Sequence, residues 1–420
     1  MKVLLIGGGA REHALCWKLA SSPKVTTIYT SPGNPGTEAI KKNKNVNLAT
    51  SPAILEFAQN QSIDLTVVGP EKPLCDGIVD LFKEKGLSIF GPSKQASQLE
   101  GSKLFAKQFM YQNDIPSATY EVFDDLPSLK RFLETAVYPC VLKADGLAAG
   151  KGVKLCFDKN EAIEFAIDCM EKRRFLHSGT VMLVEEFLEG FEISFLVLAA
   201  GKNYIPLELA QDHKKLLEGD KGPNTGGMGA YCPAPLLTKS QQEIIESTII
   251  KKTLVALESQ GNPFYGILYA GLMINSKGVK VLEYNVRFGD PEAQVILPRL
   301  KSDLAEIMLG VSQGQLPDKL EWDNRVALGI TLATEGYPDH PNTGQIISGV
   351  LNIKDDHDVH IFHAGTTRKG SDLLTSGGRV LTVVGMGSTL NEARLKAYEA
   401  ANAISYEGKN YRKDIGRGSH

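Results

Sequence analysis

Residues 1–100 alternate short apolar segments with amphipathic ones, and this alternation restricts the fold more than any other feature of the chain. The segments KVLLIG, VTTIYT, DLTVVG and LSIFG have the length and composition of buried strands. REHALCWKLASS, SPAILEFAQNQ and the stretch from Cys75 to Lys85 have helical periodicity. Strands that alternate with helices build parallel sheets. The sequence therefore predicts an α/β fold that begins with a parallel sheet.

The rest of the chain divides into three further zones, and a length of 420 residues is compatible with roughly two to four domains. Residues 101–190 hold helical segments and a glycine-rich hairpin. Residues 191–325 hold longer strands and one long helix, Lys239 to Gln260. Residues 326–420 hold the strands VALGITLAT and RVLTVVGM and a helix from Asn391 to Ser405.

Composition excludes several classes of partner. The formal net charge is −3, from 46 basic and 49 acidic residues, so the chain lacks the basic field that drives nucleic-acid binding. No apolar run approaches the roughly 18 residues of a membrane span, and the N-terminal apolar run is broken by three glycines, unlike a signal peptide. The six cysteines form no C-x-x-C pair, which indicates buried thiols in a reducing compartment. We therefore expect a cytoplasmic protein that binds neither nucleic acid nor membrane.

The segment KADGLAAGKGVKL, residues 143–155, combines three lysines with three glycines. It is not a P-loop, because the glycine spacing differs and Gly152, rather than a hydroxyl residue, follows Lys151. The flanking segments YPCVLKAD and GVKLCF predict a hairpin with a glycine tip. Such a hairpin can fold over a nucleotide, with Lys143 on its first strand. The alternative is a surface hairpin with solvent-exposed lysines.

The first strand ends in GGGARE, at the point where α/β sheets bind ligands. A dinucleotide fingerprint would require glycine at position 12, where Glu12 stands, so the pattern disfavours a nicotinamide enzyme. Backbone N–H groups at a helix start and the Arg11 fork suit a phosphate monoester. The alternative is an Arg11–Glu12 pair in solvent.

The segment KVLEYNVRFGDPE, residues 280–292, predicts a strand with one buried and one functional face. With period two, Leu282, Tyr284 and Val286 share the buried face. Glu283, Asn285 and Arg287 share the other face. The first two offer oxygen ligands of the kind that magnesium takes alongside phosphates, and Arg287 can bind a phosphate or carboxylate. The alternative is an exposed strand face with an ordinary Glu–Arg pair.

A glycine-rich loop, DKGPNTGGMGAYCPAP, follows the segment QDHKK, which contains Asp212 and Lys214. Such a loop allows the backbone to approach a ligand closely. The alternative is a linker without fixed structure, although Asn224 and Thr225 among its small residues favour a shaped loop.

Together, KADGLAAGKGV, VEEFLEG, QDHKK, GPNTGGMGAYCPAP and EYNVRFGDPE resemble the ATP-grasp ligases, and within them the glycinamide ribonucleotide synthetase family. GGGAREHAL, VGPEKPLCDGIVD, IFGPSKQASQLEGSK, FHAGT and SGGRVL are similar to the same family, so the resemblance covers nearly the whole chain. It implies an α/β ATP-grasp fold with a Rossmann-like N-terminal domain (1–100), a lid subdomain with its lead-in (101–190), a large subdomain with the metal site (191–325) and a small α+β C-terminal domain (326–420).

The resemblance also implies a reaction in purine biosynthesis. ATP phosphorylates glycine, and 5-phosphoribosylamine attacks the glycyl phosphate to give glycinamide ribonucleotide, ADP and phosphate. The expected cofactors are ATP and Mg²⁺ or Mn²⁺, and the expected assembly is a monomer, with a dimer as the alternative.

Roles for individual residues follow from the same resemblance. The residues expected to bind ATP are Lys103, Lys143, Lys151, Glu185, Glu186, Leu188 and Glu192. Those expected to hold the metal are Glu283 and Asn285. Those expected to act in catalysis are Arg287, Asp212 and Asn224. Those expected to bind substrate are Gly9, Arg11, Glu12, Asn34, Lys214, Gly226, Gly227, Met228 and Asp290.

Three other functions stay open at this point. One is a nicotinamide oxidoreductase, which Glu12 disfavours. Another is a catalytically silent nucleotide-binding regulator, which the polar face of residues 283–287 disfavours. The third is a different ATP-grasp ligase, such as a purine-pathway carboxylase or a formate-dependent transformylase.

Overall fold

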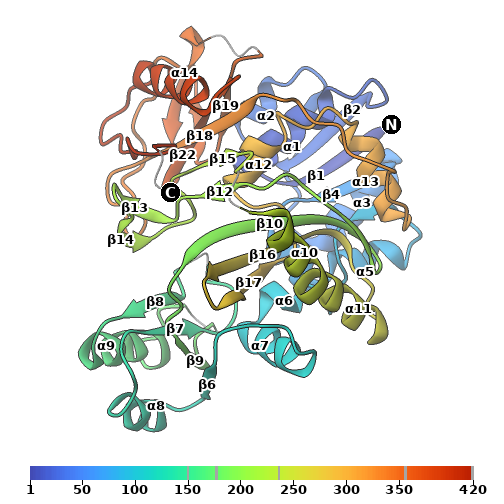
Figure 1. Ribbon diagram of the computed structural model, residues 1–420. Coiled ribbons are helices and arrows are strands. Elements are labelled where there is room, and N and C mark those ends of the chain that lie inside the picture. Colours follow the sequence, from blue (N-terminus) through green and yellow to red (C-terminus); the bar gives the residue numbers. More distant parts are fainter. Residues whose placement is uncertain (149–150, 176–177, 235–236, 354–356, 418–420) are drawn as a thin grey trace.

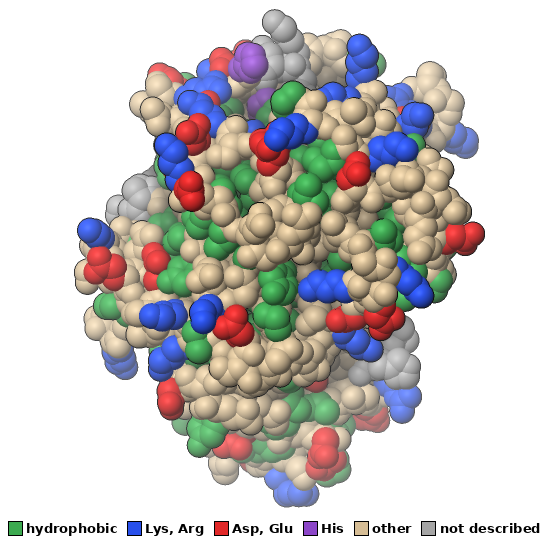
Figure 2. All heavy atoms as spheres, turned by 90° about the vertical axis from the view of Figure 1, so that its right-hand side faces the viewer, with side chains coloured by type: hydrophobic (Ala, Val, Ile, Leu, Met, Phe, Trp, Pro, Cys, Tyr) green, Lys and Arg blue, Asp and Glu red, His purple; other side chains and the backbone are tan. Residues whose placement is uncertain are grey.

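A computed structural model describes residues 1–148, 151–175, 178–234, 237–353 and 357–417. Its N-terminal and C-terminal parts lie side by side at one end of the molecule, and the lid extends from the opposite end (Figure 1). On the face drawn in Figure 2, basic and acidic side chains are interspersed, and neither sign forms a continuous field. Among the described residues, no helix combines the length and apolar character needed to cross a membrane.

The N-terminal sheet is parallel, as predicted, with the order β3-β2-β1-β4-β5. Its strands are β1 (Lys2–Gly7), β2 (Thr27–Pro32), β3 (Asn43–Asn45), β4 (Leu65–Val68) and β5 (Ile89–Phe90). The helices between them are α1 (Ala10–Ala20), α2 (Pro35–Ala39), α3 (Ser51–Gln61), α4 (Glu71–Asp76) and α5 (Ile78–Lys83). The single helix predicted from Cys75 to Lys85 is wrong, because Gly77 adopts φ 95°, ends α4 and starts α5.

The lid is a four-stranded antiparallel sheet with the order β6-β9-β7-β8. Its elements are β6 (Tyr120–Phe123), α8 (Leu126–Leu133), β7 (Cys140–Ala144), β8 (Val153–Cys156), α9 (Lys159–Met170) and β9 (Met182–Glu186), reached through α6 (Gln98–Gly101) and α7 (Lys103–Gln112). The predicted hairpin is confirmed, since β7 and β8 pair with Lys143 opposite Val153. Residues 149–150 at its tip lie outside the described residues.

The large subdomain contains a second antiparallel sheet, with the order β11-β10-β16-β17. Its strands are β10 (Phe191–Ala200), β11 (Asn203–Pro206), β16 (Tyr265–Asn275) and β17 (Gly278–Asn285). The predicted long helix is present as α10 (Lys239–Ile245), a π-helical turn (Glu246–Ile250) and α11 (Lys251–Ser259), and α12 (Glu292–Ile296) and α13 (Leu304–Ser312) follow β17. One apolar core joins this sheet to the N-terminal sheet and packs Phe195 and Val197 in the same cluster as Leu4 and Ile6.

The third sheet combines C-terminal strands with two strands from the glycine-rich region, in the order β12-β15-β18-β22-β19. These are β12 (Gln211–Asp212), β15 (Gly229–Cys232), β18 (Val326–Ala333), β19 (Val359–His363) and β22 (Arg379–Gly387). The remaining elements are β13 (Lys215–Leu217), β14 (Lys221–Asn224), a 3₁₀ turn (Val350–Asn352), β20 (Thr366–Lys369), β21 (Asp372–Thr375) and α14 (Leu390–Ala403). The C-terminal strands therefore hold the glycine-rich loop in place.

A β-bulge in β17 corrects the predicted strand faces. Gly271 pairs with Glu283 and Leu272 pairs with Val281, which leaves Leu282 as an extra residue on β17. Val281, rather than Leu282, therefore joins Tyr284 and Val286 in the apolar core. The bulge turns the Leu282 carbonyl oxygen toward the lid, where it accepts a hydrogen bond from Lys143 Nζ at 3.0 Å.

Candidate active site

Glu283 on β17 is the acidic centre of the site. Lys214 Nζ lies 3.4 Å from its Oε1 and also pairs with Glu192. Burial alone would raise the pKa of Glu283, but Lys214, Lys143 and Lys103 outweigh burial and lower the pKa to about 2. The Glu283 side chain is 43% exposed, so this ionised carboxylate remains open to a ligand.

Two lysines from different elements face this strand. Lys143 Nζ on β7 lies 3.0 Å from Glu185 Oε2, in addition to its bond to the Leu282 carbonyl. Lys103 begins α7, and its Nζ donates to the Gly146 carbonyl at 2.9 Å. Burial lowers the pKa of Lys103, and Glu283 partly offsets this effect. A metal–phosphate complex requires a carboxylate to bind the metal and cationic side chains to bind the phosphates, and this site contains both.

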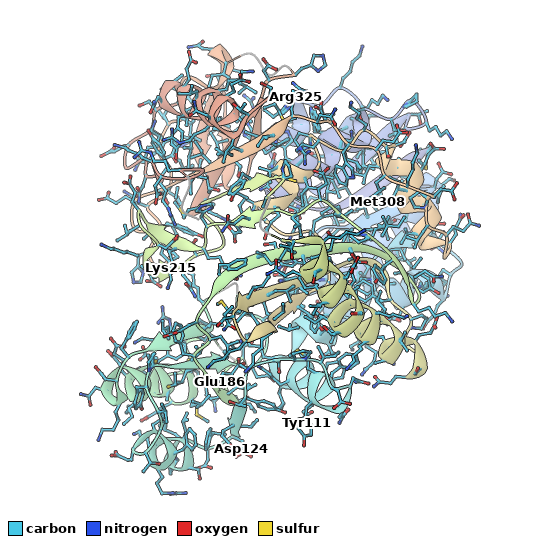
Figure 3. All side chains as sticks on the ribbon, in the orientation of Figure 1. Tyr111, Asp124, Glu186, Lys215, Met308 and Arg325 are labelled. Atoms are coloured by element: carbon cyan, nitrogen blue, oxygen red, sulfur yellow. The ribbon has the colours of Figure 1, made fainter. Side chains whose placement is uncertain are left out.

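The residues expected to hold a nucleotide base follow at the end of β9. Glu185 is 3% exposed, whereas Glu186 accepts hydrogen bonds from Thr119 N at 2.9 Å and from Lys280 Nζ at 2.6 Å. Leu188 is buried. Figure 3 places Glu186 where the lid meets the rest of the chain.

Lys151 lies at the other end of the hairpin tip, and its backbone N–H donates to the Ala148 carbonyl at 2.9 Å. The structure does not bring its side chain into the network around Glu283. Its expected role toward ATP therefore stays a prediction.

Oxygen ligands for a divalent metal are present, although the protein alone does not complete a coordination shell. The ionised Glu283 carboxylate and the Asn285 amide oxygen are hard donors that suit magnesium. No group of three or more His, Cys, Asp or Glu side chains able to hold a metal occurs in the part of the chain that the structure describes. This donor set fits a metal whose remaining ligands come from phosphate and water.

Arg287 is surrounded by carboxylates that the sequence did not indicate. Its Nη2 lies 2.5 Å from Glu100 Oε1 and 3.0 Å from Asn285 Oδ1, and its Nε lies 3.4 Å from Glu71. Burial raises the pKa of Glu100, while Arg287 partly counteracts that rise. Glu71 and Glu100 occur in VGPEKPLC and QASQLEGSK, and only three-dimensional proximity assigns them to this site.

The turn after β1 forms a closed hydrogen-bonded unit. Arg11 Nε lies 2.6 Å from Glu12 Oε1, and Gly9 N donates to Glu12 Oε2 at 2.7 Å. Both side chains of the pair are buried, so the solvent-exposed pair considered from the sequence is wrong. Arg11 Nη1 donates to the Phe288 carbonyl at 3.2 Å and connects this turn to the segment after β17.

Asn34 holds the neighbouring turn. Its Oδ1 accepts from Gly36 N at 2.9 Å and from Thr37 N at 3.0 Å, which caps α2. Its Nδ2 donates to the carbonyls of Gly8 and His363 at 2.9 and 2.8 Å. Asn34 therefore fixes the shape of this turn, and its contact with a substrate stays a prediction.

The glycine-rich loop is held against Asp290 by an arginine from β22. Arg379 Nη1 donates to the carbonyls of Gly226 and Asp290 at 2.5 and 2.8 Å, and Nη2 lies 3.1 Å from Asp290 Oδ2. A Cβ on Gly227 would lie 2.3 Å from Pro291 Cδ and 2.8 Å from Asp212 Oδ1, so only glycine fits there. The structure thus brings Asp212, Gly227 and Asp290 together.

Asp212, which lies beside Gly227, has a carboxylate with unusual hydrogen bonding and an unusual pKa. Its Oδ1 is buried and has no hydrogen-bond partner among the described residues. Burial, followed by the charge of Glu292, raises the pKa of Asp212 well above its usual range. Glu292 in turn accepts hydrogen bonds from Ser194 at 2.9 Å and Tyr269 at 2.7 Å. A carboxyl with a raised pKa is suited to proton transfer.

Two of the predicted site residues have fewer contacts with the rest of the site. Met228 is fully buried beneath the loop, which indicates a packing role. Asn224 ends β14, where it pairs with Lys215 across a two-stranded hairpin. Arg379, Glu71, Glu100 and Glu292 are the residues at the site to which sequence reasoning assigned no role. Their segments VGPEKPLC, QLEGSK, RFGDPE and SGGRVL were recognisable, but their contacts were not.

Known proteins with the same sequence pattern identify the family. The N domain of phosphoribosylglycinamide synthetase matches residues 1–100, its ATP-grasp (A) domain matches residues 101–293 and its C domain matches residues 327–418. A phosphoribosylamine–glycine ligase from Ralstonia nicotianae is 48% identical over 419 residues and covers 99% of each chain. One from Halalkalibacterium halodurans is 47% identical and covers 99% of this chain and 96% of its own.

Solved structures confirm the ATP-grasp fold. The crystal structure of a phosphoribosylamine–glycine ligase from Thermotoga maritima aligns with a TM-score of 0.85 and 34% identity, covering 99% of this chain and 100% of its own. The biotin carboxylase domain of a Hydrogenobacter thermophilus 2-oxoglutarate carboxylase shares the fold alone, with a TM-score of 0.74 and 17% identity over 97% of this chain and 91% of its own. Identity near one half along the full length, with three matched domains, places this chain in the phosphoribosylglycinamide synthetase family.

Proposed function

We propose that this chain is a phosphoribosylamine–glycine ligase of de novo purine biosynthesis. It joins glycine to 5-phosphoribosylamine with ATP and releases glycinamide ribonucleotide, ADP and phosphate. The observation that carries this proposal is Glu283, an ionised carboxylate that three lysines from three separate segments surround. Its relatives of the same length carry the ligase name.

The first step activates glycine. A glycine carboxylate oxygen attacks the γ-phosphorus of ATP, the bond to the bridging oxygen breaks, and ADP leaves with the electron pair. Lys103 and Lys143 balance the charge of the phosphates, with Lys151 at the hairpin tip. Glu185, Glu186 and Leu188 hold the adenine, and Glu192 holds the ribose hydroxyls. Positioning and charge balance supply most of the rate for such transfers.

A divalent metal is the expected cofactor of this family, with Mg²⁺ proposed and Mn²⁺ as the alternative. Glu283 and Asn285 would hold it, and when bound it neutralises phosphate charge. Arg287 lies two residues after Asn285, just beyond the end of β17, where it stabilises the transferring phosphoryl group or the glycine carboxylate. Glu100 and Glu71 fix the orientation of its guanidinium.

The second step forms the amide. The amine of 5-phosphoribosylamine attacks the acyl carbon of glycyl phosphate, phosphate leaves, and the nitrogen loses a proton. Asp212 accepts that proton, since its buried carboxyl has a raised pKa. Asn224, Gly226 and Gly227 enclose the reacting groups, with Met228 packed beneath them, and Lys214 and Asp290 fix the substrates beside them.

The phosphate of 5-phosphoribosylamine binds at the turn after β1. Arg11 contributes the donors and Gly9, whose N–H donates to Glu12, lines the turn, while Glu12 orients the guanidinium and Asn34 shapes the adjacent turn. Arg11 also contacts the Phe288 carbonyl, which connects this phosphate site to the ATP site.

Release of ADP tests the proposal directly. The purified protein with ATP and Mg²⁺ should release ADP only when glycine and 5-phosphoribosylamine are both present, and mass spectrometry should detect glycinamide ribonucleotide. Bicarbonate or formate in place of glycine should give no product. ADP release that depends on either of those replacements instead would identify a different ATP-grasp ligase.

The partners proposed for this chain are small molecules only. A monomeric assembly and a cytoplasmic location stay predictions from the sequence. Light scattering coupled to size exclusion measures the first, because a monomer should elute with the mass of one 45.6 kDa chain.

A further inference from the structure

A cluster of three buried charges lies behind the nucleotide site, and one of its members has no role in the reaction described above. Lys107 Nζ on α7 and Lys143 Nζ on β7 both lie 3.0 Å from Glu185 Oε2. Lys107 also donates to the Ala118 carbonyl at 3.0 Å and lies 5.7 Å from the Tyr120 ring centre. Lysine is rarely fully buried, yet Lys107 is 2% exposed.

Glu185 is only half satisfied by this cluster. Both lysines contact Oε2, whereas Oε1 is buried and has no hydrogen-bond partner among the described residues. A buried carboxylate oxygen without a donor is unfavourable, and such atoms are found where a ligand completes the bonding. The next residue, Glu186, marks the junction of the lid with the rest of the chain in Figure 3. The missing donor is therefore expected from a ligand bound at this junction.

The chemistry of purine bases identifies the donor. Adenine carries an amino group at its six-position, which donates to a carboxylate oxygen. Guanine carries a carbonyl oxygen there, which accepts hydrogen bonds and is repelled by the same carboxylate. A fixed Glu185 carboxylate with a free Oε1 therefore selects adenine over guanine.

We propose that Lys107 is a positioning residue that determines nucleotide specificity, because it holds Glu185 Oε2 so that Oε1 remains available to the adenine amino group. This inference rests on the ATP site of the proposed function. Lys107 itself does not touch the nucleotide, since its ammonium is committed to Glu185 and to the Ala118 carbonyl.

The two lysines that contact Glu185 Oε2 have different roles. Lys143 also bonds to the Leu282 carbonyl beside Glu283, so it lies where the phosphates of ATP are expected. A lysine that turns toward phosphate no longer neutralises Glu185. Lys107 then remains as its counter-ion, anchored by backbone and aromatic contacts away from the phosphates. Without Lys107, the buried Glu185 would compete with phosphate for Lys143.

Equilibrium binding of ADP and GDP, measured by calorimetry with Mg²⁺, tests this role without turnover. Lys107→Met should weaken ADP binding by about 10- to 100-fold, the effect of one misplaced charged hydrogen bond, and change GDP binding less than about threefold. Lys107→Arg should recover part of the ADP affinity, since it keeps the charge but changes the geometry. The control is Lys252→Met, which removes a lysine contact to the Asp114 carbonyl just beyond α7 and should leave both affinities unchanged.

A second comparison separates positioning from general damage to the fold. In a Glu185→Gln background, Lys107→Met should change the ADP-to-GDP preference by less than about twofold, because Lys107 acts only through Glu185. The double variant removes the charges of Lys107 and Glu185 together, so it remains informative if Lys107→Met alone fails to fold. Equal losses of ADP and GDP affinity in Lys107→Met, unchanged ADP affinity, or independent effects of the two substitutions would overturn the proposal.

The outcome is distinguishable from failure of the proposed function. A wild-type protein that prefers ADP and loses that preference with Lys107→Met, but forms no glycinamide ribonucleotide, contradicts only the ligase activity. A wild-type protein that makes the product while Lys107→Met keeps its ADP preference contradicts only the role of Lys107.

Discussion

Lys214 Nζ lies 3.4 Å from Glu283 Oε1, and the same ammonium pairs with Glu192. One lysine of the QDHKK segment therefore contacts both the carboxylate proposed for the metal and the one proposed for the ribose. Burial would lower the pKa of Lys214, but these two carboxylates raise it well above its usual range. The lysine thus stays charged, and it keeps Glu283 ionised.

Glu283→Gln keeps the shape of the side chain but removes its charge. We expect kcat to fall by about 100-fold or more, the scale of losing one preorganised electrostatic contact. The melting temperature should fall as well, because the lysines that lower the pKa of Glu283 stabilise the folded state through its charge. Glu258→Gln, on an exposed part of the same subdomain, is the matched control and should retain normal activity. Activity of Glu283→Gln within a few-fold of wild type would show that Glu283 is not a metal ligand.

The lid hairpin offers two lysines with different surroundings. Lys143→Met should weaken ATP binding and turnover, because it deletes a charged contact worth about 1.5–3 kcal/mol. Lys154→Met removes a lysine on the next strand that contacts the Glu161 carbonyl at 3.4 Å, and it should be nearly neutral. Steady-state kinetics with ATP varied compares the two. Equal losses in both variants would indicate damage to the hairpin rather than loss of a phosphate ligand.

Arg11→Ala tests the second substrate site. A group that binds the substrate phosphate holds ground and transition states equally, so its loss raises KM rather than lowering kcat. We expect KM for 5-phosphoribosylamine to rise by about 10- to 100-fold, while KM for ATP and for glycine changes little. Because Arg11 and Glu12 form a buried pair, stability should fall as well.

Arg11→Lys serves as the control, since it keeps the charge but not the fork geometry. It should recover most of the stability and only part of the affinity. If KM rises for ATP alone, or for no substrate, Arg11 does not bind this phosphate.

Asp212→Asn tests two properties of this carboxyl, its role in catalysis and its effect on the stability of the fold. Loss of a proton acceptor should lower kcat by about 10²- to 10⁴-fold. The pKa of Asp212 is higher in the folded than in the unfolded protein, so its contribution is favourable below the unfolded pKa of about 4 and is lost as pH rises through the folded pKa.

The asparagine variant should therefore equal or exceed the wild-type melting temperature above neutral pH, and its stability should depend less on pH. Calorimetry from pH 5 to 9 measures this difference. A variant with normal kcat, or one whose stability falls more steeply with pH than that of the wild type, contradicts the assignment.

The sequence predicted those parts of the fold that depend on local periodicity. The N-terminal parallel sheet follows from alternating strands and helices, and the β7–β8 hairpin follows from two strands around a glycine turn. The break at Gly77 also had a local signal, since a glycine inside a helical pattern often ends the helix in a left-handed conformation. Each of these features is encoded by residues that are close together in the sequence.

Other features depend on partners far away in the chain. The bulge at Leu282 depends on how β16 pairs with β17, which strand periodicity does not show. Arg287 is 187 residues from Glu100, and Arg379 is 153 residues from Gly226. Segments with functional residues were recognisable by their composition and resemblance. The contacts that orient them were not, because one sequence carries no direct information about which segments meet.

The central claim is that ATP activates the glycine carboxylate, and oxygen transfer from glycine to phosphate tests it most directly. The enzyme is supplied with glycine labelled with ¹⁸O in both carboxylate oxygens, together with ATP, Mg²⁺ and 5-phosphoribosylamine. A glycyl phosphate intermediate breaks at the bond between carbon and oxygen, so each released phosphate should carry one labelled oxygen and the product amide should retain the other. Phosphate without label, released in step with product, would contradict activation through glycyl phosphate and with it the central claim.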